Sequence, residues 1–231
     1  NSLLPVDYNI NISYSGDKKY NPVKNSTILH VVKGDVSLNV NANDIYFGDD
    51  LVINIAFNES DVDGNVTIKL NDIEKGTASI SNGTAIFTIK NPDAGNYTVS
   101  VIYDGGNNDS GAQANRSVNV YQQNSTFDIS ISQNADNSVK LVVDINATGN
   151  VTFIVGSIEE TVDIIDNQAV LDNIYLNNAN YVAEITYNGD KNYHPSTSEF
   201  NFAIKNDKLL IRYYVDGIVT KSGDGTRTRP F

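Results

Sequence analysis

The sequence predicts an all-β protein made of tandem immunoglobulin-like β-sandwich domains of about seven strands each. The composition is rich in Val, Ile, Tyr, Thr and Asn, and no long stretch places Ala, Leu, Glu and Lys at helical spacing. The pattern of residues 180–195 recurs at residues 7–22 and, in a degraded form, at residues 96–111. Such self-similarity indicates a tandem array with units of about 85 residues, a size that can bury a core unaided.

Each copy of the pattern predicts a half-buried strand that runs into a structured turn. Two tyrosines stand six residues apart with apolar residues two and four positions after the first tyrosine, so alternate side chains face inward. The turn sequences, Ser-Gly-Asp-Lys-Lys-Tyr-Asn-Pro and Asn-Gly-Asp-Lys-Asn-Tyr-His-Pro, contain Gly for positive φ and Asp for capping. The tyrosine pairs are Tyr8 and Tyr14, Tyr97 and Tyr103, and Tyr181 and Tyr187.

The first complete domain is expected at residues 34–122. Its apolar residues alternate with polar ones, and Asn82-Gly83 is the signal of a tight hairpin turn. The expected strands cover residues 35–42, 51–58, 65–71, 75–80, 84–89, 96–103 and 115–121, which is an immunoglobulin-like number.

The second complete domain is expected at residues 123–206, with the same order of strands. Gly149-Asn150-Val151-Thr152 matches Gly64-Asn65-Val66-Thr67, Asp166-Asn167 replaces the Asn-Gly turn, and residues 199–204 form the closing strand. Residues 1–33 are expected to be the C-terminal part of an incomplete domain, with a second strand at residues 26–32. Two strands alone make a marginal hairpin, so another part of the protein or another chain would complete them.

Each tyrosine strand is entered through a turn, which predicts a tyrosine corner. Tyr97 and Tyr181 would each bury the ring and hydrogen-bond backbone upstream through the hydroxyl. The chain has no cysteine, so the cores are expected to be held by aliphatic packing without disulfides.

These motifs resemble a known family. The Gly-Asn-Val-Thr segment, the tyrosines at six-residue spacing and the loop of residues 187–195 are similar to the Ig-like repeats of large adhesin-like cell-surface proteins, of the methanogenic archaeal and bacterial type. The resemblance covers residues 1 to about 206, although the copy after Tyr103 has lost the Lys, the second Tyr and the Pro. It implies tandem repeats on an extracellular, cell-surface protein and identifies no ligand.

The tail, residues 207–231, departs from the repeat. Leu209, Ile211, Tyr213 and Val215 alternate as one more strand. The Gly-Asp-Gly-Thr and Pro-Phe segments after it resemble the opening of a right-handed parallel β-helix region. The alternatives are an ordinary linker or a strand donated to a neighbouring subunit.

Charge and hydropathy narrow the function classes. The net charge is −12, and without the tail 11 basic residues stand against 25 acidic ones, which argues against nucleic-acid binding. No apolar run approaches the roughly 20 residues of a membrane helix, so no membrane insertion is expected within this segment.

Residues for catalysis are not grouped in any recognisable pattern, so no enzyme activity and no cofactor are expected. The two histidines, His30 and His194, lie in different units, and no nucleophile-elbow, phosphate-loop or zinc-protease motif occurs. Lys33 or Lys205 could form an isopeptide bond with a buried Asn, although solvated lysines are the simpler interpretation. Acidic pairs make calcium possible, against solvated turns: Asp49 with Asp50, Asp61 with Asp63, and Asp104 with Asp109.

Many asparagines lie in Asn-x-Ser/Thr triplets, which are acceptors for N-glycosylation on an exported protein. The candidates are Asn11, Asn25, Asn58, Asn65, Asn82, Asn96, Asn108, Asn115, Asn124, Asn146 and Asn150.

The favoured function is a structural shaft segment of an extracellular adhesin-like protein, with short junctions that limit bending between domains. One alternative is a module that binds glycans or proteins of a host or neighbouring cell through the loops after the tyrosine strands, with contacts from Tyr20, Tyr193 and His194. Another is a filament subunit that joins copies of itself by strand exchange. A third is an accessory segment of an enzyme whose catalytic domain lies elsewhere.

Overall fold

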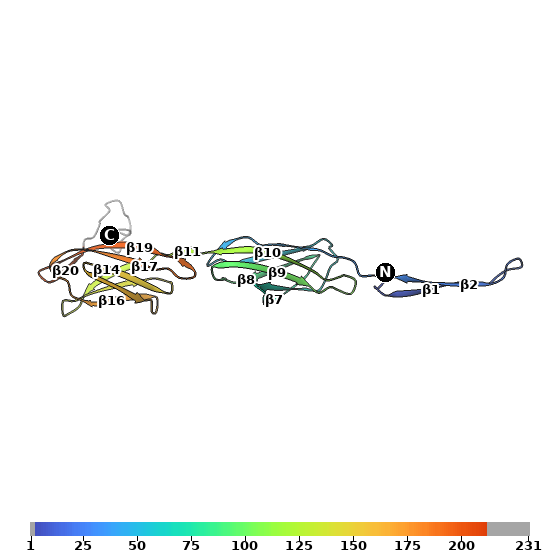
Figure 1. Cartoon of the computed structure of the whole chain (residues 1–231), viewed down its shortest axis with the longest axis horizontal. Helices are drawn as coiled ribbons and strands as arrows, with labels where there is room; N and C mark the ends of the chain where they lie inside the picture. Colours follow the sequence, from blue (N-terminus) through green and yellow to red (C-terminus); the bar gives the residue numbers. More distant parts are fainter. Residues whose placement is uncertain (1–2, 212–231) are drawn as a thin grey trace. The chain divides into compact units, whose positions relative to one another are not determined.

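A computed structural model of the chain describes residues 3–211 and shows an all-β protein in two units, Asn1–Tyr121 and Gln122–Phe231 (Figure 1). Unit 1 contains a hairpin and a β-sandwich, and unit 2 contains a second β-sandwich. Residues 3–211 include no helix long and apolar enough to cross a membrane. The strands of unit 1 are β1 (Asp7–Tyr14), β2 (Val23–His30), β3 (Leu38–Asn41), β4 (Ile45–Tyr46), β5 (Leu51–Phe57), β6 (Asn65–Leu70), β7 (Ile73–Ser79), β8 (Thr84–Ile89), β9 (Gly95–Tyr103) and β10 (Ala112–Tyr121).

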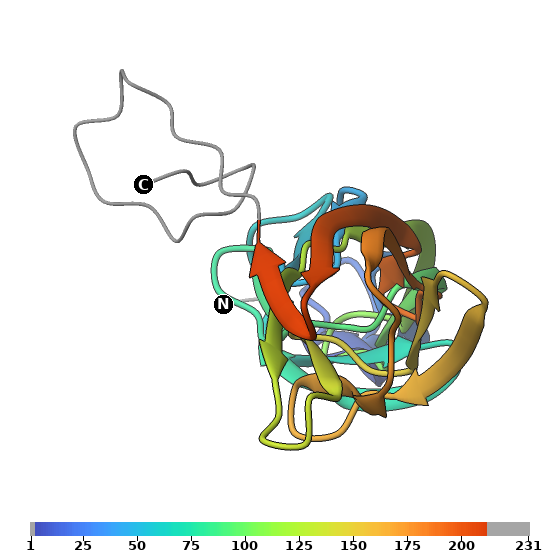
Figure 2. The ribbon, with the colours of Figure 1, turned by 90° about the vertical axis from the view of Figure 1, so that its left-hand side faces the viewer.

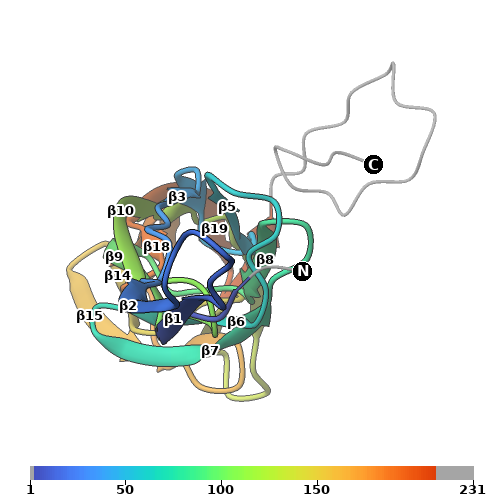
Figure 3. The same ribbon diagram turned by 90° about the vertical axis from the view of Figure 1, so that its right-hand side faces the viewer.

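The sandwich of unit 1 has two sheets, in the orders β3-β5-β8 and β4-β10-β9-β6-β7 (Figure 3). This is the predicted immunoglobulin-like arrangement, in which the tyrosine strand β9 lies at the centre of the larger sheet. The alternation of β5 shows why these residues form strands: Leu51, Ile53 and Ile55 are buried, whereas the residues between them are exposed. The inward residues of both sheets form one hydrophobic core.

The sandwich of unit 2 repeats this plan with sheets β12-β13-β16 and β15-β14-β17-β19-β20 (Figure 2, yellow to red strands). Its core is separate from that of unit 1 and includes the fully buried rings of Phe153 and Tyr187. The strands are β11 (Gln123–Asn124), β12 (Asp128–Gln133), β13 (Val139–Asp144), β14 (Asn150–Val155), β15 (Ile158–Asp163), β16 (Gln168–Ile174), β17 (Ala179–Tyr187), β18 (Tyr193–His194), β19 (Ser196–Lys205) and β20 (Lys208–Ile211).

The two sandwiches cover the same sheet edge in different ways. In unit 1, β4 pairs in parallel with Val120 and Tyr121 of β10. In unit 2, β20 pairs antiparallel with residues 202–205 of β19. Matching residues of β10 and β19 are 84 positions apart, so these residues correspond to residues 118–121 of β10. β4 was not predicted from the sequence. A tail strand was expected, of which Leu209 and Ile211 lie in β20, while Tyr213, Val215 and the expected β-helix start lie outside the described residues.

Two aspartates account for this difference. Asp44 holds the segment before β4 beside β10, because its carboxylate accepts hydrogen bonds from the backbone N–H (2.8 Å) and side-chain amide (3.1 Å) of Asn119. In unit 2, Asp136 instead closes a turn through Ser138, so β12 stays paired with β13 up to Gln133. Hydrogen bonds from the Ser138 hydroxyl, the Tyr175 hydroxyl and the Ser138 N–H lower the pKa of Asp136 to about 2.

Residues 7–30 form an antiparallel hairpin within the chain, β1 with β2. The second strand begins at Val23, directly after Pro22, and ends at His30, so the prediction of residues 26–32 was shifted toward the C-terminus. The polar run Lys24-Asn25-Ser26 hid this start, because cross-strand pairing rather than alternation defines it.

The Asn82-Gly83 turn forms as predicted, with φ values of 51° and 68° and the Ser81 and Thr84 backbones bonded to each other. Asp166-Asn167 does the same in unit 2, with φ values of 51° and 64°. The hydroxyl groups of Tyr97 and Tyr181 donate to carbonyls four residues upstream, at 2.8 and 2.9 Å, which confirms both predicted tyrosine corners.

Replacement of Gly83 by Ala should destabilise unit 1 by about 2–4 kcal/mol, because the new Cβ adds positive-φ strain and meets the backbone of Glu59 and Ser60. Gly48→Ala is the matched control, since Gly48 has a φ of 99° but open space around it, and should cost only about 1–2 kcal/mol. Urea unfolding of the two variants would measure both losses. Equal losses would show that the clash contributes nothing.

Candidate functional site

The candidate site is the loop that follows each tyrosine strand. It connects β1 to β2, β9 to β10 and β17 to β19, at residues 15–22, 104–111 and 188–195. In every copy the last tyrosine pairs with the residue nine positions later: Tyr14 with Val23, Tyr103 with Ala112, and Tyr187 with Ser196. The three loops therefore have the same length even though the middle sequence is degraded.

Asp190 organises the loop of unit 2. One carboxylate oxygen accepts hydrogen bonds from the backbone N–H groups of Asn192 (2.7 Å) and Tyr193 (2.8 Å). The other accepts from the N–H (3.0 Å) and hydroxyl (2.8 Å) of Thr148, at the end of a different loop. Burial works to raise the pKa of Asp190, but these four hydrogen bonds outweigh it and lower the pKa overall.

The hairpin loop has the same internal bonding around Asp17. Its carboxylate accepts from the N–H groups of Lys19 (2.7 Å) and Tyr20 (2.9 Å), and these bonds, with one from Tyr14, lower the pKa of Asp17. The Gly and Pro of the motif are explained by a close approach. At Gly16 and Gly189, with φ values of 83° and 81°, a Cβ would lie 2.9 and 3.0 Å from the nitrogen of the loop proline.

The loop of unit 1 is held by other groups, because Gly106 stands where unit 2 has Asp190. A Cβ at Gly106 would lie 2.8 Å from the hydroxyl oxygen of Tyr103, which is buried and has no hydrogen-bond partner among the described residues. Burial, and then the negative charges of Asp109 and Asp63, raise the pKa of Tyr103. Burial likewise raises the pKa of Tyr187, with a further contribution from Asp190.

In both units the loop binds the segment by which the chain enters the sandwich. Gly34 donates to the carbonyl of Asn108 (2.8 Å) and accepts from the N–H of Ser110 (2.8 Å), and the Lys33 ammonium donates to the carbonyl of Gly106 (2.7 Å). In unit 2, Gln123 donates to the carbonyl of Asn192 (2.9 Å). The side-chain amide of Gln122 donates to the carbonyl of Asp190 (2.8 Å).

The three residues predicted to contact a ligand lie in different surroundings. Tyr20 is 67% exposed. Tyr193 is half-buried against the core of unit 2, and its backbone pairs with Gln123. His194 is exposed, and its carbonyl accepts a hydrogen bond from the Ser125 hydroxyl (2.9 Å). The corresponding positions in unit 1 are Asp109 and Ser110, so the arrangement is not repeated.

The histidines and lysines singled out by sequence are all exposed. His30 is exposed on β2 with its Nδ1 2.6 Å from the Asp7 carboxylate. Lys33 and Lys205 are both exposed.

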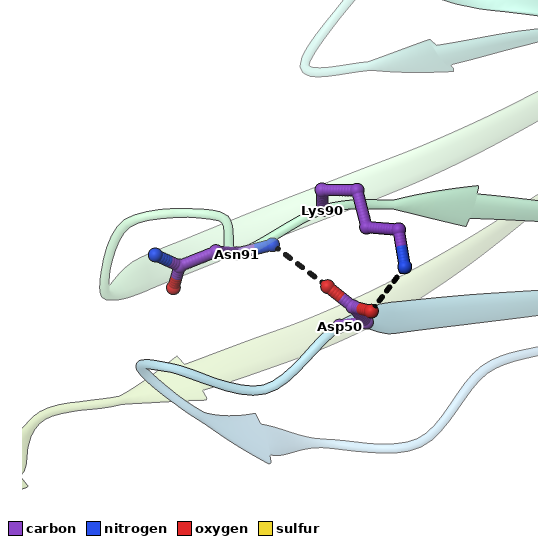
Figure 4. Close-up of polar contacts among 3 residues, drawn as sticks. All are labelled: Asp50, Lys90 and Asn91. Atoms are coloured by element: carbon purple, nitrogen blue, oxygen red, sulfur yellow. Dashed lines mark hydrogen bonds and ion pairs between the residues drawn. The ribbon is translucent and has the colours of Figure 1, made fainter.

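Within residues 3–211 no group of three or more His, Cys, Asp or Glu side chains could hold a metal ion. Asp50 instead accepts from the Lys90 ammonium (2.6 Å) and the Asn91 N–H (3.2 Å), linking the ends of β5 and β8 (Figure 4). The bond from Lys90 is the main cause of the lowered pKa of Asp50. Asp63 and Asp109, expected in two separate pairs, both lie near Gly106.

The candidate glycosylation residues are mostly accessible. Asn150 is the half-buried one, and its side-chain oxygen accepts a hydrogen bond from the Asn188 amide (2.7 Å). The other ten are exposed: Asn11, Asn25, Asn58, Asn65, Asn82, Asn96, Asn108, Asn115, Asn124 and Asn146.

The two-sheet topology and the tyrosine corners define the class of the protein as tandem immunoglobulin-like β-sandwich modules. No family model and no curated protein matches the chain.

Among solved structures, the chain is similar to a two-domain fibronectin type III segment of chicken tenascin, at 14% identity and a TM-score of 0.42, over 70% of this chain and 97% of that one. The fibronectin(III)-like modules of Clostridium thermocellum CbhA match at 11% identity and a TM-score of 0.32, over 70% and 92% of the two chains. A β-glucuronidase of Parabacteroides merdae matches at 9% identity and a TM-score of 0.29, over 71% of this chain and 24% of the enzyme. Likenesses this distant carry no information about function.

Replacement of Asp190 by Ala should destabilise unit 2 by about 2–4 kcal/mol, because it leaves backbone and Thr148 donors without their charged acceptor. The folded-state pKa is lowered, so the contribution of Asp190 is present above its unfolded pKa of about 4 and is lost as pH falls through the folded value. The wild type should therefore lose stability more steeply below about pH 4 than the variant does.

Urea unfolding at a series of pH values would measure this difference. Asp163→Ala is the control, since Asp163 is exposed on β15. Equal stability of the Asp190 and Asp163 variants would contradict a structural role for the loop aspartate.

Proposed function

We propose that this segment is a non-enzymatic structural shaft of an extracellular, adhesin-like cell-surface protein. The proposal rests on the hydrogen bonds made by the loops that follow the tyrosine strands. In the loops after β9 and β17, the groups that could have formed a binding site bind the chain's own backbone, including the segment that enters each sandwich. Loops bonded in this way suit a repeating structural module that bears load and keeps its neighbours in position.

The junction between the two sandwiches also supports a shaft. The last strand of unit 1 ends at Tyr121 and the first strand of unit 2 begins at Gln123, so a single residue separates them. That residue, Gln122, is itself hydrogen-bonded to the loop of unit 2. A junction with so little free chain is proposed to restrict bending between modules.

The shaft proposal predicts that the two sandwiches tumble together. Their ¹⁵N relaxation rates should give one rotational correlation time, longer than that of an isolated module of this size. Insertion of a flexible Gly-Ser linker after Gln122 should give two shorter times, and serves as the control. Independent tumbling in the unmodified chain would contradict the proposal.

A second candidate function is a glycan-binding module, favoured by one residue. Tyr20 presents an exposed ring at the tip of a loop that Asp17 holds in shape, and exposed aromatic rings suit stacking on sugars. Its counterpart Tyr193 is half-buried, which is why the shaft is preferred.

The shaft function predicts no saturable binding to a glycan array. A saturable signal that Tyr20→Ala abolishes would support the binding module instead and refute a purely structural role. Asn21→Ala, a neighbouring exposed loop residue, is the matched control, and circular dichroism would show that both variants remain folded.

A further inference from the structure

The hairpin β1–β2 is a third copy of the hairpin that closes each sandwich. Tyr14 and Tyr187 are 173 residues apart, and the same offset relates their partners Val23 and Ser196. It also relates the pairs at the other end of the hairpins, Asp7 with His30 and Asn180 with Ala203. The cross-strand register of the two hairpins is therefore identical over eight residue pairs.

The tyrosine corner is present in the hairpin as well. The hydroxyl of Tyr8 bonds to the backbone four residues upstream, accepting from the N–H of Leu4 at 2.9 Å, as that of Tyr181 bonds to Asn177. Such a corner fixes the turn between the strand before it and the tyrosine strand. Residues 3–14 thus carry the features of a tyrosine strand together with the turn that leads into it.

The face that this hairpin should bury is exposed. Ile10, Ile12 and Tyr14 are 40%, 64% and 43% exposed. The equivalent residues of unit 2, Ala183, Ile185 and Tyr187, are all 0% exposed. Across the hairpin, Leu29 is 40% exposed, whereas its counterpart Phe202 is 3% exposed. Neither hydrophobic core contains a residue of β1 or β2.

Unit 2 shows what such a face requires. One partner is a strand along the edge of the tyrosine strand, supplied by β14 through Val151, Phe153 and Val155 opposite Tyr187, Ile185 and Ala183. The second is a facing sheet, β12-β13-β16, whose aliphatic side chains share the same core. Among the described residues, β1 has β2 as its only partner strand.

We propose that the exposed face of the β1–β2 hairpin packs against the strands that precede the tyrosine strand in a further sandwich of the same kind, contributed by the same polypeptide ahead of residue 3. A second copy of this chain could not supply those strands, because both of its sandwiches already use theirs, through β6 against β9 and β14 against β17. Leu3 agrees with the proposal. It is exposed here, while the equivalent Leu176 packs against the core of unit 2.

This proposal rests on the hairpin face and holds whether or not the protein is a shaft. Its test is to restore the missing strands from the chain's own modules. In one chimera, residues 124–175 are joined to Leu3, and in another residues 35–91 are joined to Leu3, which keeps the 173- and 89-residue offsets. Hydrogen exchange would then be compared with that of the unmodified chain.

In at least one chimera, the amides of β1 and β2 should exchange at least about 100-fold more slowly than in the unmodified chain. Ile12→Asp in that chimera should return them to fast exchange, because it places a charge on the packed face. Asn11→Asp introduces the same charge on an exposed neighbour whose side chain lies on the other side of the strand, and should leave the protection unchanged.

Two results would overturn the proposal. One is unchanged exchange of the hairpin amides in both chimeras while units 1 and 2 stay folded. The other is dimerisation of the unmodified chain across about a 100-fold range of concentration, abolished by Ile12→Asp, which would make a second copy the occupant of the face. Sedimentation velocity would detect it, and neither result decides whether the two complete sandwiches share one correlation time.

Discussion

The antiparallel pairing of each tyrosine strand with the strand after it is the constraint on which the rest of the structure depends. Because side chains alternate between faces, a register slip of one residue would turn the buried tyrosine and its apolar neighbours toward solvent. The pairing places Tyr187 opposite Ser196 and Tyr103 opposite Ala112, with the same separation of nine residues. Loop length is therefore fixed by the core, while loop sequence is fixed only where a backbone group needs a partner.

Local patterns were enough to predict most of the sandwich. Alternation located β5 and β8 to within a residue, and Asn82-Gly83 identified the turn between β7 and β8. Both features depend on residues that are close in sequence. The covered edge of the larger sheet could not be predicted. Whether β4 or β20 occupies it depends on Asp44 reaching Asn119, 75 residues away, and on Asp136 closing a turn instead.

The candidate site was likewise predictable where it depends on neighbouring residues and not where it depends on distant ones. The glycine and aspartate of the loop had turn roles that the sequence indicated, and the structure gives them those roles. The bond between Asp190 and Thr148 spans 42 residues and left no local signal. Acidic residues were grouped by closeness in sequence, although folding brings Asp63 and Asp109 to the same glycine from different loops.

The degraded loop of unit 1 shows which part of the motif is needed. Gly106 removes the carboxylate that binds the loop in unit 2, but the bonds to the entering chain are kept. Gly34 donates to the carbonyl of Asn108 as Gln123 does to that of Asn192. The Lys33 ammonium donates to the carbonyl of Gly106 as the Gln122 amide does to that of Asp190. The same backbone bond, with a lysine in one unit and a glutamine in the other, thus fixes the loop to the entering chain. The hydrogen bonds between the loop and the entering chain are preserved although the side chains that make them change. The loop is therefore better understood as the element that fixes how the chain enters each sandwich than as a site for one particular ligand.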